Sequence, residues 1–193
     1  DNENKETEYS ADHIVIATGA RSRELPFLPI DGEKVIGYRQ AMTLPKQPKK
    51  MIIVGSGAIG VEFAYFYNSM GTEVVIVEFL PNLVPLEDEE VSKQFEKSFK
   101  KSGIKVMTNS SVTKVDTSGN GVKATIKTKN GEEVMEADVV LSAVGIKSNI
   151  EGIGLEDIGI VVDKDKILVN DFYQTNLPGY YLSLIHISEP TRL

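Results

Sequence analysis

The chain contains 193 residues, of which 41% are hydrophobic, so it can bury a core of one domain, or of one domain with pieces of a neighbour. Its net charge of -7 disfavours nucleic acid and anionic membrane surfaces as partners, because both repel an acidic protein. We expect a cytoplasmic location, since no apolar run approaches the roughly 20 residues of a membrane span and the acidic N-terminus does not resemble a secretion signal.

The first quarter of the chain contains one predicted strand and a connector. The β-branched run from Asp12 to Thr18 ends at Gly19, which is typical of a buried strand followed by a turn. Residues 21–50 contain prolines that fit neither helix interiors nor central strands. We therefore expect residues 21–50 to be a connector.

A βαβ unit is predicted from Met51 onward. Residues Met51 to Val54 form an apolar strand, and Ala58 to Met70 has the apolar spacing of a helix. Gly71 stands where a helix C-cap would be, and Glu73 to Val77 forms the second strand. These elements predict two parallel strands joined by a crossover helix.

A second helix and a return to the sheet follow. Acidic residues 87–90 favour a helix start, and apolar residues recur at every fourth position from Val91 to Phe99. The strand Ile104 to Met107 comes next. Three short strands then predict an antiparallel meander, namely Ser111–Asp116, Val122–Lys127 and Glu132–Glu136. The buried strand 138–144 returns to the parallel sheet, so the meander replaces a helix.

Three glycines lie between the first strand of this unit and its helix in the pattern G-x-G-x-x-G. Gly55 allows a tight turn, Gly57 lets the backbone approach a pyrophosphate, and Gly60 lets the helix pack on the strand. The surrounding βαβ context strengthens a motif that is weak alone, although a turn without a ligand remains the alternative. The sequence thus predicts an α/β fold, a Rossmann-like parallel sheet with a three-stranded antiparallel meander, of the FAD/NAD(P)-binding type.

An acidic residue ends the second strand. Glu78 stands where a carboxylate can accept hydrogen bonds from both hydroxyls of an adenine ribose, whereas an NADP site would favour a cation. The alternative is a solvated acid at a strand end. Glu62, near the start of the helix, is equally consistent with a place near the cofactor and with helix-dipole stabilisation. The sequence favours NAD(H) over NADP(H).

No catalytic or metal-binding residue is predicted in this chain. His13 and His186 have no Asp or Glu at ligand spacing, and metal sites need several converging ligands. The chain contains no cysteine, which excludes disulfides, thiolate metal sites and dithiol chemistry carried by the chain itself. Arg21 and Arg23 are assigned no role.

Three segments resemble the dihydrolipoamide dehydrogenase family of flavin-dependent disulfide oxidoreductases. The main one is Met51 to Val106, and its neighbours are ATGARSRELP, from Ala17 to Pro26, and SAVGIKSNIEGIGLEDIGI, from Ser142 to Ile160. The sequence EFLP from Glu78 and the helix start EDEEV separate the chain from the similar glutathione and thioredoxin reductases, which have basic residues after the second strand.

The resemblance implies where cofactors bind. The segment around the NAD pyrophosphate and nicotinamide would be Gly55, Ser56, Gly57, Ala58, Ile59, Gly60, Val61 and Glu62. Glu78 would bind the ribose, Val112 would lie beside the adenine, and Gly145 would let the backbone approach the nicotinamide. FAD would bind mostly outside this chain and would contact it at Thr18, Gly19 and Ala20.

The resemblance also implies a domain plan. Residues 1–50 would be the end of a flavin-domain strand with the connector, 51–150 the NAD-binding domain, and 151–181 a return toward the flavin domain. Residues 182–193 match nothing in the family and resemble translated sequencing adapter, so we expect a non-native tail. The family's cysteine pair, first flavin motif and C-terminal domain with the catalytic histidine have no counterpart, so we expect a fragment.

Three functional interpretations follow. The first is the NAD-binding domain of a dihydrolipoamide dehydrogenase, inactive alone, whose parent would be a homodimer associated with a 2-oxo acid dehydrogenase complex. The second is the same domain of another flavoprotein, such as a mercuric reductase or an NADH oxidase. The third is a non-catalytic NAD-binding module.

Overall fold

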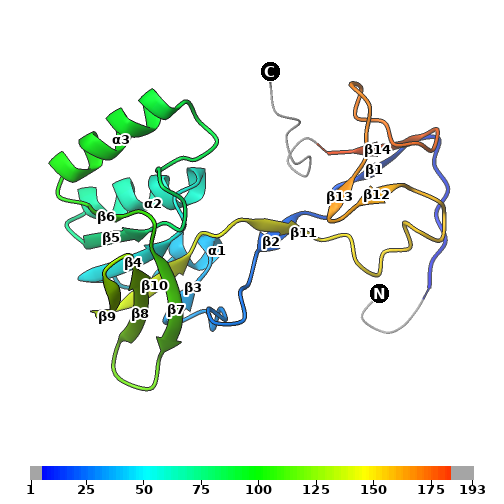
Figure 1. The fold of residues 1–193 in the computed structure, drawn as a ribbon. Coiled ribbons are helices and arrows are strands. Elements are labelled where there is room, and N and C mark those ends of the chain that lie inside the picture. The colour runs from blue at the N-terminus through cyan, green and yellow to red at the C-terminus, as the bar shows by residue number, and fades with distance from the viewer. Residues whose placement is uncertain (1–5, 184–193) are drawn as a thin grey trace. The chain divides into compact units, whose positions relative to one another are not determined.

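The computed structural model describes residues 6–183, and the chain divides into two compact units. The larger unit consists of residues 22–146. The smaller unit combines the residues that precede and follow the larger unit in the sequence, which are 6–21 and 147–183 within the described range. Figure 1 shows the helices and strands of both units.

A five-stranded parallel sheet with the order β3-β10-β4-β5-β6 forms the centre of the larger unit. Its strands are β3 (Val35–Ile36), β4 (Lys50–Val54), β5 (Glu73–Val77), β6 (Lys105–Met107) and β10 (Val139–Ser142). Strands β4 and β5 pair from Lys50 opposite Glu73 to Val54 opposite Val77. Most side chains of β4, β5 and β10 are buried, which requires cover on both faces of the sheet.

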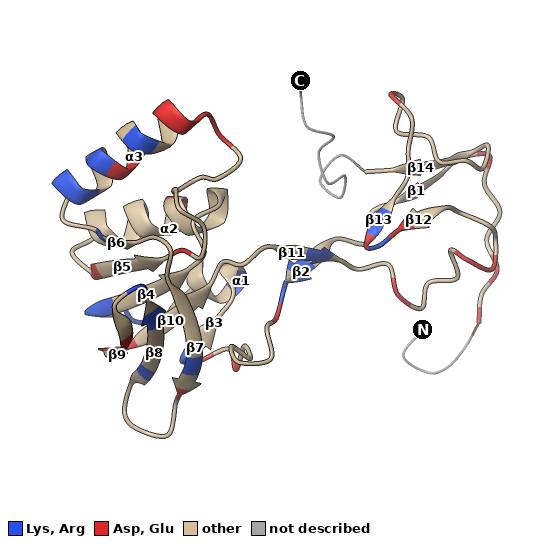
Figure 2. Ribbon diagram, in the orientation of Figure 1, with Lys and Arg blue, Asp and Glu red and all other residues tan. Residues whose placement is uncertain are grey.

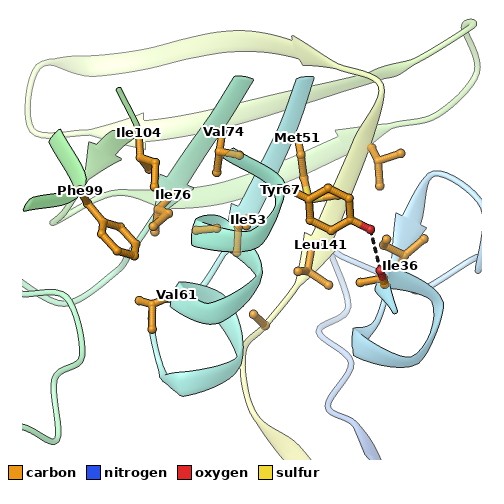
Figure 3. Packing of buried hydrophobic residues seen from close by; sticks show 14 of the residues in the cluster. Ile36, Met51, Ile53, Val61, Tyr67, Val74, Ile76, Phe99, Ile104 and Leu141 are labelled. Atoms are coloured by element: carbon orange, nitrogen blue, oxygen red, sulfur yellow. Dashed lines mark hydrogen bonds between the residues drawn. The ribbon is translucent and has the colours of Figure 1, made fainter. Parts of the chain in front are cut away.

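Helices cover one face of this sheet. They are α1 (Tyr38–Ala41), α2 (Ala58–Ser69) and α3 (Glu89–Lys101). Figure 3 shows the core between sheet and helices, whose labelled members are Ile36, Met51, Ile53, Val61, Tyr67, Val74, Ile76, Phe99, Ile104 and Leu141. The hydroxyl of Tyr67 donates to the carbonyl oxygen of Ala41 at 2.5 Å, and burial raises the pKa of Tyr67. This hydrogen bond joins α2 to α1.

A three-stranded antiparallel sheet covers the opposite face (Figure 1). Its strands are β7 (Ser111–Asp116), β8 (Val122–Thr128) and β9 (Gly131–Ala137), in that order. Along β4 and β5, every second side chain belongs to the core under the helices, and the side chains between them face the antiparallel sheet. Ile52 and Val75, for example, belong to the same buried cluster as Ile126 of β8. The predicted α/β fold with its meander in place of a helix is confirmed.

Charge along α3 follows the dipole of the helix. Asp88 caps its N-terminus by accepting a hydrogen bond from the backbone N–H of Glu90 at 2.8 Å. Acidic residues occupy the first turn and lysines the last turn, as the red and blue ends of α3 show in Figure 2. Both placements stabilise a helix, because its N-terminus is positive and its C-terminus negative. The acidic run 87–90 therefore has a structural explanation.

The smaller unit has short strands and a small core. Strand β1 (Ile14–Ile16) pairs in parallel with β14 (Tyr180–Leu182), and β12 (Val162–Asp163) pairs with β13 (Lys166–Ile167). Strands β2 (Ala20–Ser22) and β11 (Ile146–Ser148) also pair, and each contains one residue of the larger unit. The core of the smaller unit consists of Ile16, Leu155, Ile160, Ile167 and Leu182.

Three observations differ from the sequence expectations. Residues 21–50 are more than a connector, because they contribute β3 and α1, which are too short to give a periodic pattern. Strand β1 is less buried than expected, since it pairs with β14 alone among the described strands and leaves Val15 60% exposed. Leu182 belongs to β14 rather than to the tail, because it is buried opposite Ile16. Residues 184–193 lie outside the described residues.

Within residues 6–183, no helix has the length and apolar character that crossing a membrane requires.

Candidate functional site

The glycine-rich segment forms the turn between β4 and α2. Gly55 has a φ of +101°, and a Cβ atom there would lie 2.4 Å from the carbonyl oxygen of Ala143. A Cβ atom on Gly60 would lie 2.2 Å from the carbonyl oxygen of Gly55. Both positions exclude any larger residue, because the atoms they would meet belong to the backbone. Gly55 and Gly60 therefore hold strand, turn and helix in close contact.

Gly57 differs from its two neighbours in the motif. It is the N-cap of α2 with a φ of -67°, and a Cβ atom there would meet no atom of residues 6–183 within 4 Å. No side chain of the described part of the chain caps this helix end, and its first turn holds no acidic residue. Neither the φ of this position nor a neighbouring described atom requires a glycine. A glycine facing open space at an uncapped helix N-terminus suits the close approach of a phosphate group.

The acid at the end of β5 is buried against this turn. Glu78 is only 6% exposed. Its Oε2 accepts hydrogen bonds from the backbone N–H and the Oγ hydroxyl of Ser56, at 2.8 and 2.7 Å. Its Oε1 accepts from the backbone N–H of Leu80 at 2.8 Å. The alternative of a solvated acid at a strand end does not hold, because the carboxylate is buried and bonded to protein donors.

A cavity of about 1080 Å³ opens beside these groups within the larger unit. It lies at the carboxyl ends of β4, β5 and β10, and its wall is mainly apolar. The lining includes the following residues of the predicted site: Gly55, Ser56, Gly57, Ala58, Ile59, Glu78, Val112 and Gly145. The remaining lining residues are Leu25, Phe27, Val54, Val77, Phe79, Leu80, Pro85, Leu86, Ser110, Ser111, Thr113, Ala143, Val144 and Ile146. Their apolar side chains suit a planar aromatic ring.

The other predicted residues do not line this cavity. Gly60 and Val61 are buried in the packing of α2, and Glu62 is exposed. Thr18, Gly19 and Ala20 belong to the smaller unit. His13 packs edge-to-face on Tyr181, with their ring centroids 5.7 Å apart. His186 lies outside the described residues.

Sequence reasoning missed several apolar residues of the cavity wall. Phe79 is 73% exposed and Leu86 is 95% exposed, although both are large apolar side chains. Both belong to the segment between β5 and α3, which has no periodicity from which to place it. Their one signal in the sequence is the apolar pair Phe79-Leu80 directly after the acid. The adjoining Val84 is a β-branched residue with a φ of 41°, a strained conformation that costs about 1–3 kcal/mol.

Comparisons with known proteins show the family to which the chain belongs. The family model described as pyridine nucleotide-disulphide oxidoreductase matches residues 1–183. Dihydrolipoyl dehydrogenase of Rhizobium etli is 41% identical over 174 residues, covering 90% of this chain and 36% of that protein. The mitochondrial dihydrolipoyl dehydrogenase of Pisum sativum is 40% identical over 182 residues, covering 93% of this chain and 36% of that protein.

A solved structure shares the fold as well. The crystal structure of LpdA from Mycobacterium tuberculosis superposes with a TM-score of 0.84 at 30% identity. That match covers 96% of this chain and 40% of the LpdA chain. The chain thus spans little more than a third of the two curated relatives, at 36% of each.

Proposed function

The chain belongs to the pyridine nucleotide-disulphide oxidoreductase family, and we propose that it is the NAD(H)-binding domain of a flavin-dependent dihydrolipoamide dehydrogenase. The proposal rests above all on Gly57, which faces open space at an uncapped helix N-terminus beside an apolar cavity. The pyrophosphate would bind at Gly57 and the start of α2. The adenine would occupy the apolar part of the cavity near Val112.

Glu78 would select NAD(H) over NADP(H). Its buried carboxylate lies in the cavity wall, where it can accept a hydrogen bond from a ribose hydroxyl. The 2'-phosphate of NADP(H) would meet this negative charge instead. At a separation near 4 Å and an effective dielectric constant near 20, each pair of like charges costs up to about 4 kcal/mol before screening.

The parent enzyme would convert dihydrolipoamide and NAD⁺ to lipoamide, NADH and a proton. Bound FAD would supply the redox chemistry between the dithiol and the nicotinamide. Residues Thr18, Gly19 and Ala20 would contact FAD, and Gly145, with a φ of +109°, would let the nicotinamide approach the backbone. We further propose that the parent is a homodimer associated with a 2-oxo acid dehydrogenase complex.

This chain alone would bind NADH without catalysing the reaction. It contains no cysteine, so it cannot exchange electrons with a dithiol through a disulfide of its own. We expect the purified chain to be colourless and to show no lipoamide-dependent oxidation of NADH above a blank. A yellow protein that retains FAD would contradict this part of the proposal.

Isothermal titration of the chain with NADH and with NADPH tests the proposal. We expect NADH to bind clearly more tightly, and Glu78→Ala to remove most of the difference. Glu132→Gln, at an exposed acid on β9, is the matched control and should leave both affinities unchanged. Equal binding of NADH and NADPH by the unmodified chain would contradict the role of Glu78. A folded chain that binds neither nucleotide would contradict the proposed function.

A further inference from the structure

Ser56 joins three parts of the candidate site. It is 1% exposed, and each of its polar groups bonds to the segment that begins at the end of β5. Its N–H and its hydroxyl both donate to Oε2 of Glu78, at 2.8 and 2.7 Å. Its carbonyl oxygen accepts a hydrogen bond from the N–H of Val84 at 3.0 Å. The middle residue of the glycine turn therefore holds both the acid and the strained loop that follows it.

These contacts limit what the carboxylate can still accept. An ionised carboxylate has about four acceptor positions, two on each oxygen. Ser56 fills both positions on Oε2, and the N–H of Leu80 fills one on Oε1. One position on Oε1 is left for a ribose hydroxyl. The expectation that Glu78 binds both ribose hydroxyls therefore requires the Ser56 hydroxyl to turn away first.

On the basis of the proposed function, we infer that Ser56 is a positioning residue that sets the preference for NAD(H) by fixing the Glu78 carboxylate. A 2'-phosphate could be admitted if the carboxylate turned away from the cavity. Turning would break hydrogen bonds to a buried charged group, which are costly to lose because water does not replace them. The backbone donors of Ser56 and Leu80 persist in any variant, so the serine hydroxyl is the part that a substitution can remove.

The inference differs from a purely structural role for Ser56. A structural role predicts that losing the hydroxyl lowers the melting temperature and weakens both nucleotides equally. A positioning role predicts a change in the ratio of the two affinities, and only where Glu78 is present. Ser142 offers a matched control, because its Oγ is buried and has no hydrogen-bond partner among the described residues.

The test is a double-mutant cycle on the full chain. Dissociation constants for NADH and NADPH are measured for the unmodified chain, Ser56→Ala, Glu78→Ala, the double variant and Ser142→Ala. We expect Ser56→Ala to reduce the preference for NADH by about tenfold or more, the effect of one hydrogen bond to a charged group. In the Glu78→Ala background the same substitution should change the preference less than about twofold. Ser142→Ala should leave the preference unchanged.

A second measurement uses the nucleotide-free chain. The N–H of Leu80 should exchange with deuterium faster in Ser56→Ala, because its acceptor is less firmly held. Ser56→Cys replaces the hydroxyl with a slightly larger group that is a weaker donor, so its exchange rate and its preference for NADH should lie between those of the unmodified chain and Ser56→Ala. It is the second variant where Ser56→Ala folds poorly.

The outcomes separate this inference from the function on which it rests. If the folded, unmodified chain binds neither nucleotide, the proposed function and the inference both fail. If it prefers NADH but Ser56→Ala has the same preference, the inference alone fails. An equal change in both Glu78 backgrounds, or tighter NADH binding through the freed acceptor on Oε2, would also overturn it.

Discussion

Replacing Gly57 with alanine is expected to weaken nucleotide binding at least tenfold while leaving the fold intact. A methyl group at this position would meet no described atom within 4 Å, and the φ of -67° suits any residue. The added methyl group would occupy the space that a pyrophosphate needs in order to reach the N-terminus of α2. Folding and binding should therefore separate at this one residue.

The two other glycines of the motif supply the contrast. Alanine is a poorer N-cap than glycine, which lowers the free energy of unfolding of Gly57→Ala by several tenths of a kcal/mol. Alanine also reduces the conformational entropy of the unfolded chain, which raises the free energy of unfolding by about 0.4–1 kcal/mol. The two effects nearly cancel, so stability should hardly change. Alanine at Gly60 would place Cβ 2.2 Å from a backbone oxygen, an overlap that costs about 1–3 kcal/mol or more. Alanine at Gly55 combines a similar overlap with a φ of +101°, and should cost most.

Thermal unfolding and titration with NADH measure both effects. We expect the melting temperature of Gly57→Ala to stay within about 2 °C, and that of Gly60→Ala to fall by roughly 3–10 °C. The affinity of Gly57→Ala for NADH should fall at least tenfold, about 1.4 kcal/mol or more. A Gly57→Ala chain that binds NADH like the unmodified chain would refute the placement of the pyrophosphate. One that melts like Gly60→Ala would refute the argument from open space.

Three further predictions concern stability. Tyr67→Phe leaves the buried carbonyl oxygen of Ala41 without its donor, so it should cost about 1–3 kcal/mol in thermal unfolding without changing NADH affinity. Burial would raise the pKa of Asp31, but hydrogen bonds from three backbone amides outweigh it and lower the pKa. Asp31 therefore stabilises the fold above its unfolded pKa and loses this effect as the pH falls through the lower folded pKa. In denaturant unfolding measured from pH 7 to pH 3, Asp31→Asn should lose less stability on acidification than the unmodified chain. A chain ending at Ser183 should melt like the full chain, whereas ending at Tyr181 removes buried Leu182 and should cost roughly 1.5–3 kcal/mol.

The parallel sheet and the meander were predictable because their patterns are strong. The apolar runs within β4 and β5 indicated strands, and the predicted strand 73–77 matches β5 from end to end. The meander strands follow from turn residues between short alternating segments. Strand β3 and helix α1 were not predictable, because two and four residues carry no period.

The contacts of the carboxylate were beyond the reach of sequence reasoning. The motif places an acid at the end of β5, but the bond between Ser56 and Glu78 joins residues 22 positions apart through a particular side-chain orientation. From the sequence alone, Ser56 occupies one of the variable positions of the motif, between Gly55 and Gly57, and nothing predicts a function for its hydroxyl. Its function becomes visible only when its hydroxyl is seen to fill an acceptor position on the acid.

The order of the strands explains why the site lies where it does. From β4 the chain continues to β5 and β6 on one side, while β10 and β3 lie on the other side. The loops that leave β4 and β10 therefore diverge at their carboxyl ends, and a crevice forms between them, as in other open parallel sheets. The glycine turn follows β4, Glu78 follows β5, and Gly145 comes shortly after β10, so three segments far apart in sequence line one cavity. The topology brings the groups together, and the residue at each strand end decides what they can bind.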